Sequence, residues 1–132
     1  MELSPNVFFV EDVPHSWLFP QVAAVIHHGG AGTTAAALRA GVPAVITPFA
    51  GAGDQVSWAD LAVRLGVGPP ARAIKQMPPE HLAYAIQECV NHPALRANAA
   101  ALGQKIRAEN GVLNAVALIE QYATKFSGHH SP

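Results

Sequence analysis

A short stretch in the first quarter of the chain has the residue types and order needed to bind a phosphate group. His27 and His28 follow an apolar run, and the small residues 29–32 then lead into Thr33 and Thr34. Glycines let a backbone approach a ligand closely, and the free amides and dipole of a following helix attract an anion. The stretch therefore predicts an oxyanion cradle at a strand-to-helix turn.

Only one of two adjacent histidines can face such a ligand, because neighbouring side chains on a strand point to opposite faces. His28, beside the loop, is the better candidate to bind a phosphate oxygen, and His27 is expected to pack into the sheet. The same geometry argues against one metal ion held by both rings. A tight turn without a ligand stays open as an alternative, since the stretch matches neither a dinucleotide fingerprint nor a nucleotide-triphosphate loop.

A second glycine-containing stretch, residues 51–53, ends in Asp54 and Gln55. Two polar side chains in tandem before a helix suit hydrogen bonding to the hydroxyls of a sugar. Taken alone, such a pair more often opens a helix than binds a ligand.

Alternating apolar runs and helical patterns must position these two loops. The expected strands are 7–10, 22–27, 43–47 and, at a sheet edge, 69–74. The expected helical segments are 16–21, 33–40 with Gly41 as a left-handed cap, 57–65, one that opens at 78–80 and runs to 90, one that starts at 91–93 with Pro93 and runs to 106, and 112–126. Strands that alternate with helices indicate an α/β fold with a parallel sheet, whose sites lie at the carboxyl ends of the strands.

The last three helical segments each carry an apolar stripe. Cys89 lies in the first of them and is expected to be a small buried hydrophobe. The stripe of the last segment consists of Val112, Val116, Ile119, Ala123 and Phe126. Stripes of this kind most often form core, so we expect a structural role for all three helices.

Composition limits the class of protein. With 132 residues, half of them hydrophobic and 13% charged, the chain is long enough for one packed domain and is not a disordered polar segment. A net charge of −1 without a like-charge run offers no nucleic-acid surface, and a single cysteine excludes an internal disulfide. No apolar run approaches the roughly 20 residues of a membrane span, and no signal peptide is evident. We expect a cytoplasmic domain over 1–126 and a disordered tail over 127–132.

Together, several stretches resemble the donor-binding half of UDP-sugar-dependent glycosyltransferases with the GT-B fold. The likeness covers roughly residues 7–126 and is strongest to sterol 3-β-glucosyltransferases and bacterial natural-product glycosyltransferases. The stretches that carry it are 14–19, 27–43, 48–49 and 54–58. The resemblance implies a Rossmann-like parallel sheet flanked by helices, as the incomplete C-terminal half of a GT-B fold.

The resemblance also implies roles for the two loops. Asp54 and Gln55 would hold the transferred hexose, for which the sterol-type likeness suggests glucose, and Val13 and His15 would contact the uracil. The UDP-sugar would be a co-substrate, with no metal and no further cofactor. The residues implied for the donor diphosphate are His28, Gly30, Ala31, Gly32, Thr33 and Thr34.

Three departures from the family's pattern modify these expectations. Ala36 stands where plant members usually carry an acidic ribose contact, and the loop before Asp54 has two apparent extra residues. The third departure is the N-terminal acceptor domain with its catalytic base, which this sequence does not contain. We therefore expect a fragment, an excised subdomain or one subunit of a split enzyme. The strand expected at 7–10 would either move beside 22–27 or leave free edges through which two chains pair as a homo-oligomer.

Three functions remain open from the sequence. The first is an inverting glycosyltransferase, or its donor-binding part, that acts on a lipid, sterol or natural-product hydroxyl. The second is a non-catalytic nucleotide-sugar-binding module whose partner supplies the acceptor domain and the base. The third is a structural remnant that binds nothing.

Overall fold

A two-stranded parallel sheet lies at the centre of the fold in the computed structural model, which describes residues 4–51, 53–70 and 72–127. Strand β1 (Val25–His27) pairs with β2 (Ala44–Ile46), and Ile26 lies opposite Val45. The ladder continues past the strand ends, since the Thr47 N–H donates to the His27 carbonyl at 2.8 Å. The expected parallel α/β arrangement is confirmed.

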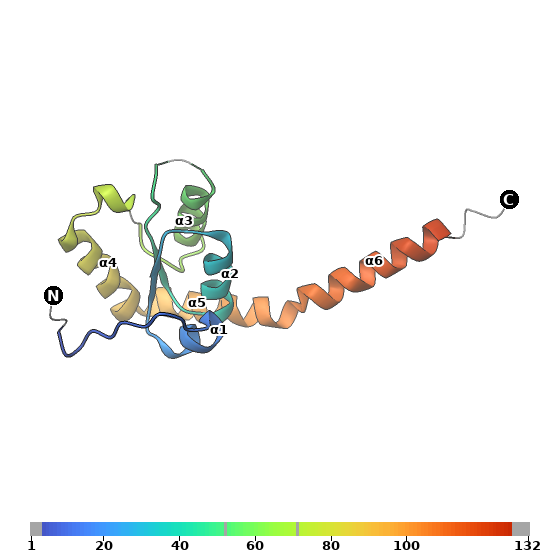
Figure 1. The fold of residues 1–132 in the computed structure, drawn as a ribbon, viewed down its shortest axis with the longest axis horizontal. Coiled ribbons are helices and arrows are strands. Elements are labelled where there is room, and N and C mark those ends of the chain that lie inside the picture. The colour runs from blue at the N-terminus through green and yellow to red at the C-terminus, as the bar shows by residue number, and fades with distance from the viewer. Residues whose placement is uncertain (1–3, 52, 71, 128–132) are drawn as a thin grey trace.

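Helices cover both faces of this sheet (Figure 1). The helical segments are α1 (His15–Leu18), η1 (Phe19–Gln21), α2 (Ala31–Ala40), α3 (Asp54–Arg64), η2 (Ile74–Gln76), α4 (Pro79–Asn91), α5 (Pro93–Glu109) and α6 (Gly111–Ser127). Side chains on a strand alternate between faces, so Ala44 and Ile46 join the core formed with α2, α3 and α5. Val45 faces the other way and packs with Ala85 and Cys89 of α4. The expected burial of Cys89 is confirmed.

Helix α2 ends where it meets α5. Gly41 has a φ of +77°, and its N–H donates to the carbonyls of Ala37 and Leu38, so the expected left-handed cap is confirmed. Gly103 of α5 lies directly against it: a Cβ on Gly103 would come within 2.6 Å of the Gly41 Cα. This close approach fixes α2, and therefore the loop that precedes it, against α5.

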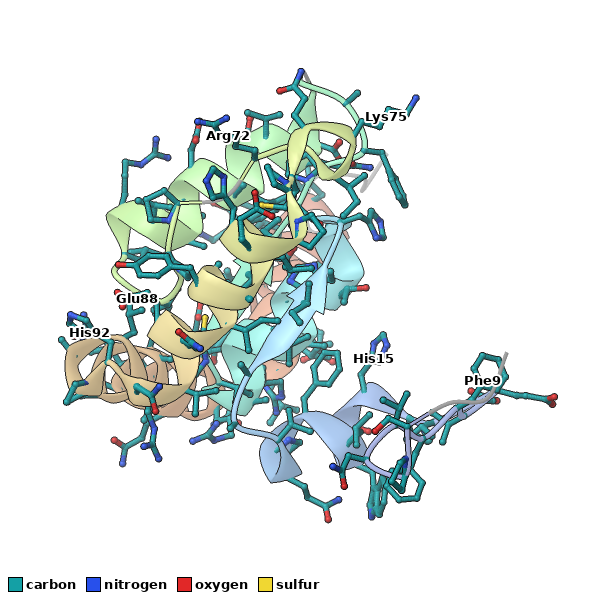
Figure 2. The ribbon with its side chains drawn as sticks, turned by 90° about the vertical axis from the view of Figure 1, so that its left-hand side faces the viewer. Phe9, His15, Arg72, Lys75, Glu88 and His92 are labelled. Atoms are coloured by element: carbon teal, nitrogen blue, oxygen red, sulfur yellow. The ribbon has the colours of Figure 1, made fainter. Side chains whose placement is uncertain are left out.

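Residues 7–10 do not form the expected strand. They pair with no other segment of the described chain and are exposed, with Phe8 85% and Phe9 80% accessible. Figure 2 shows Phe9 far out on the N-terminal segment, away from the helices. A β-branched and aromatic run favours a strand only where a neighbouring strand edge completes it, and here no such edge is reached. This apolar run is therefore surface and not core.

The edge strand expected over 69–74 is also absent from the described residues. Pro69 and Pro70 have no N–H to donate to a ladder, and the segment enters η2 instead. The Ile74 N–H donates to the Pro48 carbonyl at 2.9 Å, which attaches η2 to the second loop.

Two helices differ from their expected form. Helix α3 begins at Asp54, three residues before the expected Ser57, because Gly53, with a φ of +99°, turns the chain directly into it. Helix α6 projects from the body (Figure 1), and its stripe is exposed rather than core, as at Val112 and Ile119. No described helix combines the length and apolar character needed to cross a bilayer. Ser127 closes α6, and the rest of the tail expected over 127–132 lies outside the described residues.

Candidate functional site

The two glycine-containing loops meet at the carboxyl ends of β1 and β2. Gly29 has a φ of +91°, a conformation that glycine adopts without strain. A Cβ at this position would lie 2.9 Å from the Gln55 carbonyl oxygen and 2.9 Å from Cγ2 of Ile46. Only a glycine therefore allows the first loop to lie against the second, and the structure brings together two motifs that are 26 residues apart.

The start of α2 presents unused backbone donors. Gly30 is the N-cap, no side chain caps the helix, and the N–H groups of Ala31, Gly32 and Thr33 have no hydrogen-bond partner among the described residues. Such amides, together with the helix dipole, form an anion-binding surface. Three of the expected diphosphate contacts therefore lie side by side on one turn.

Thr34 differs from its neighbours in the loop. Its N–H and its Oγ1 both donate to the Gly30 carbonyl at 2.9 Å, and the side chain is only 2% exposed. The hydroxyl is thus engaged in holding the turn, and the structure does not bring it to the open face. Thr33, which is half-buried, is the hydroxyl left near the free amides.

His28 lies over this loop. Its ring stacks on Phe49 with the centroids 5.0 Å apart and the planes 15° apart. Its Nε2 is 2.7 Å from the position that a Cβ on Gly30 would occupy, so the ring has its present place because residue 30 is glycine. Sequence reasoning gave Phe49 no role of its own; the available signal was a large aromatic directly after the Pro48 that closes a strand.

His27 packs inward, as expected for its strand position. Its Nδ1 accepts a hydrogen bond from the Gly29 N–H at 3.1 Å. Burial, together with the smaller effects of the nearby His28 and His15, lowers the pKa of His27 to about 4. The ring is therefore neutral with its proton on Nε2, which is buried without a partner among the described residues. His27 shapes the first turn of the loop rather than the open face.

The polar pair of the second loop is used within that loop. The Asp54 Oδ1 accepts a hydrogen bond from the Gln55 N–H at 2.9 Å. The Gln55 Oε1 accepts one from the Phe49 N–H at 3.0 Å, which places this side chain behind the ring that supports His28. The Gln55 backbone lies against Gly29 of the first loop, and one oxygen of each side chain is engaged within the second loop, while the Asp54 Oδ2 has no hydrogen-bond partner among the described residues.

The residues expected at the uracil lie at the N-terminal end of α1. The His15 ring stacks on Phe19 with the centroids 4.5 Å apart, and Figure 2 shows it standing at the start of α1. Val13 is half-buried.

Concave surface lies beside these loops rather than within them. A pocket of about 170 Å³ borders the second loop and is lined by residues such as Pro48, Gly51 and Asp60, but not by Asp54 or Gln55. The face formed by His28 and the α2 amides is open. Among the described residues, no group of three or more His, Cys, Asp or Glu side chains could hold a metal ion.

Comparison with known proteins agrees with this arrangement. Residues 1–118 match the family described as Erythromycin biosynthesis protein CIII-like, C-terminal domain. A sterol 3-beta-glucosyltransferase of Arabidopsis thaliana is 45% identical over 115 residues, which are 87% of this chain and 18% of that protein. The O-mycaminosyltylonolide 6-deoxyallosyltransferase of Streptomyces fradiae is 43% identical over 124 residues, which are 93% of this chain and 29% of that protein.

Solved structures give the same result. The glycosyltransferase of kitacinnamycin superposes with a TM-score of 0.79 at 34% identity, over 92% of this chain and 30% of its own. Glycosyltransferase VinC, solved in complex with dTDP, superposes with a TM-score of 0.75 at 28% identity, over 91% of this chain and 31% of its own. The chain thus spans less than a third of each of these proteins. It belongs to the Erythromycin biosynthesis protein CIII-like C-terminal domain family, the C-terminal domain of family 1 glycosyltransferases with the GT-B fold.

Proposed function

We propose that this chain binds the donor of a glycosyl transfer, a UDP-hexose with glucose as the first candidate, through the first loop. The observation that carries the proposal is the group of free N–H donors at Ala31, Gly32 and Thr33 beneath the ring of His28. These donors suit a diphosphate, because a helix N-terminus offers directed N–H groups and about half a positive charge.

The same donors have a role in the chemical step. In an inverting transfer an acceptor hydroxyl attacks the anomeric carbon from one face, and the bond to the diphosphate breaks on the other. Negative charge grows on the leaving diphosphate as that bond breaks, and preorganised donors stabilise it most at that point. The general base that takes the hydroxyl proton, and the pocket for a lipid, sterol or natural-product acceptor, would come from an N-terminal domain.

The sugar would lie toward the second loop. Asp54 is exposed, and Gln55 reaches the first loop through its backbone contact with Gly29. The Gln55 Oε1 already accepts a hydrogen bond from the Phe49 N–H, so a sugar hydroxyl must share this oxygen or displace that N–H. We therefore propose that sugar binding adjusts this loop, whereas diphosphate binding uses donors that are already free.

Calorimetry with UDP, UDP-glucose and dTDP-glucose tests the proposal on the chain as it stands. His28→Ala should weaken UDP by about 1.5–3 kcal/mol, the range for a hydrogen bond to a charged group. His81→Ala, an exposed histidine on α4, serves as the matched control and should leave UDP affinity unchanged. Equal UDP affinity in the wild type and in His28→Ala would reject the site.

A second candidate is a non-catalytic binding module, because the free N–H groups at Ala31, Gly32 and Thr33 can bind an anion without any catalytic side chain. Measuring glucose transfer from UDP-glucose distinguishes the glycosyltransferase from the non-catalytic module. We expect the purified chain to bind UDP-glucose but to transfer glucose to a sterol only at background level until an acceptor domain is added. Robust glucose transfer by the chain alone would contradict the proposal of a non-catalytic module and would support an autonomous enzyme.

The proposal extends to assembly and location. The backbone of Ile26 faces away from β2 and has no partner among the described residues, and its side chain is 47% exposed. An unpaired strand edge favours strand addition, so we propose that an acceptor domain or a second copy covers β1. Solution scattering should show a dimer, and a clean monomer would reject the second copy.

Cytoplasm is the proposed location, where the single buried Cys89 stays reduced.

A further inference from the structure

A pocket of about 400 Å³ lies on the flank of α2, at the end opposite the first loop. It is lined by Ser16, Pro20, Ala36, Arg39, Ala40 and Arg107. Its volume falls in the range of small-molecule sites. Along a helix axis, Arg39 lies roughly 12 Å from Ala31, at 1.5 Å per residue, so the pocket is separate from the free amides.

Two arginines line this pocket without a counter-charge. Neither Arg39 nor Arg107 forms an ion pair with any described residue, and no carboxylate lines the pocket. Arg107 is held in place by a hydrogen bond from its Nη1 to the Arg39 carbonyl, across 68 residues of sequence. The Arg39 side chain has no hydrogen bond within the described part of the chain.

The hydrogen bond of Arg107 also has a structural purpose, because a cation at the end of α2 stabilises the last carbonyls of that helix. It uses one of the five N–H donors of the guanidinium. The half negative charge of the helix end is small against the two full positive charges of the arginines. The pocket therefore keeps a net positive potential and unused forked donors.

We propose that this pocket binds an organic phosphomonoester, with Arg39 and Arg107 on the phosphate. Guanidinium groups match phosphate oxygens in a fork geometry, and the hydroxyl of Ser16 adds one more donor. Pro20, Ala36 and Ala40 form a small apolar wall that suits the organic body of such a ligand. The arginines are not part of the first loop, but Ala36 lines the pocket at the position where plant members of the family usually carry a ribose contact, so the pocket borders the nucleoside end of the proposed UDP-sugar site.

The test compares the binding of phenyl phosphate with the binding of phenol at low ionic strength. Calorimetry measures the two affinities, and the arginine side-chain resonances in NMR report where each ligand binds. The wild-type chain should bind phenyl phosphate at least about tenfold more tightly than phenol, as expected for charge-assisted hydrogen bonds. Arg39→Gln should weaken phenyl phosphate about tenfold or more, and its free side chain makes this variant safe for the fold. Arg96→Gln, an exposed arginine on α5, is the control and should have no effect.

The remaining variants decide where the phosphate lies. His28→Ala should leave the shifts that phenyl phosphate causes in the arginine side-chain resonances unchanged, because these resonances report the pocket and not the first loop. Arg107→Lys should keep the fold while reducing affinity, because it retains the charge but loses the fork. Unchanged phenyl phosphate affinity in Arg39→Gln would overturn the proposal. Loss of phenyl phosphate binding in His28→Ala would also overturn it and would assign phosphate binding to the first loop alone.

Discussion

The two loops at the carboxyl ends of β1 and β2 are built in opposite ways. The first presents backbone N–H groups that nothing uses, at Ala31, Gly32 and Thr33. The second presents side chains, at Asp54 and Gln55, that each already accept one hydrogen bond within the loop. A site made of backbone at a helix start is preformed, whereas a site made of side chains can exchange one partner for another. Under the proposed function, this difference predicts that affinity comes from the first loop and selectivity from the second.

Gly29→Ala should have the largest effect on the two loops, because the added methyl group forces them apart. The new Cβ would meet the Gln55 backbone and Ile46 at a positive φ, so both strain and overlap act together. We expect a loss of about 3 kcal/mol in the free energy of unfolding, measured by urea titration, with UDP affinity lost as well. Gly32→Ala, where a Cβ meets open space, should cost little stability; equal losses in both variants would contradict the close contact of the loops.

Gly30→Ala should separate binding from stability within the first loop. The added methyl collides with the His28 ring, which can swing away, while the backbone at −61° tolerates alanine. Stability should therefore stay within about 0.5 kcal/mol of the wild type, while UDP weakens by about 1.5–3 kcal/mol. Gly51→Ala in the second loop faces open space and should leave UDP affinity intact. An unchanged UDP affinity in Gly30→Ala would mean that His28 makes no ligand contact.

Acidification should act on the first loop through His27. Its pKa is about 4 in the folded chain and near 6.5 when unfolded, so the unfolded state binds the extra proton first as pH falls. Stability should therefore decrease between about pH 6.5 and 4, by about 1–2 kcal/mol once partial exposure of the ring is allowed for. His27→Gln should flatten that part of the urea-monitored profile, and exposed His92→Gln should not. A profile that is identical in wild type and His27→Gln would rule out this residue as the source.

Asp54→Ala and Gln55→Ala should give the smallest effects and affect selectivity alone. Each variant should reduce the affinity difference between UDP-glucose and UDP by about 1 kcal/mol, the typical net value of one hydrogen bond, and keep UDP affinity itself. Calorimetry with both ligands gives the difference directly. If UDP weakens equally, the pair only positions the loop, as its bonds to Phe49 and Gln55 already do in this structure.

Local chemistry made much of this fold predictable from the sequence. Gly41 ended α2 as expected, Pro93 began α5, and the glycines around His28 indicated a strand-to-helix turn. The wrong predictions were those that depend on contacts with distant parts of the chain. The apolar run 7–10 has strand propensity but no partner edge in the described chain, and the α6 stripe has a helical period although its large side chains, such as Val112, Ile119 and Phe126, are exposed. A period identifies a face, and only tertiary contact shows whether that face is covered.

The candidate site shows the same division. Both loops were identifiable from residue types, but the engagement of Thr34 with Gly30 and of Gln55 with Phe49 was not. Those two bonds are local, four and six residues apart, but they depend on the rotamer that each side chain adopts, which residue type and spacing do not give. The stacking of His28 on Phe49 is non-local, since the two rings are 21 positions apart, and spacing carries no information on it.

The junction between α5 and α6 has a mechanical consequence. Asn110, with a φ of +50°, is the single residue that separates the two helices, and α6 extends roughly 25 Å beyond it at 1.5 Å per residue. A helix of this length acts as a lever arm: a turn of about 20° at Asn110 displaces its far end by roughly 9 Å. A spectroscopic label at Phe126 would therefore magnify small backbone adjustments at the end of α5 into changes that distance measurements can resolve.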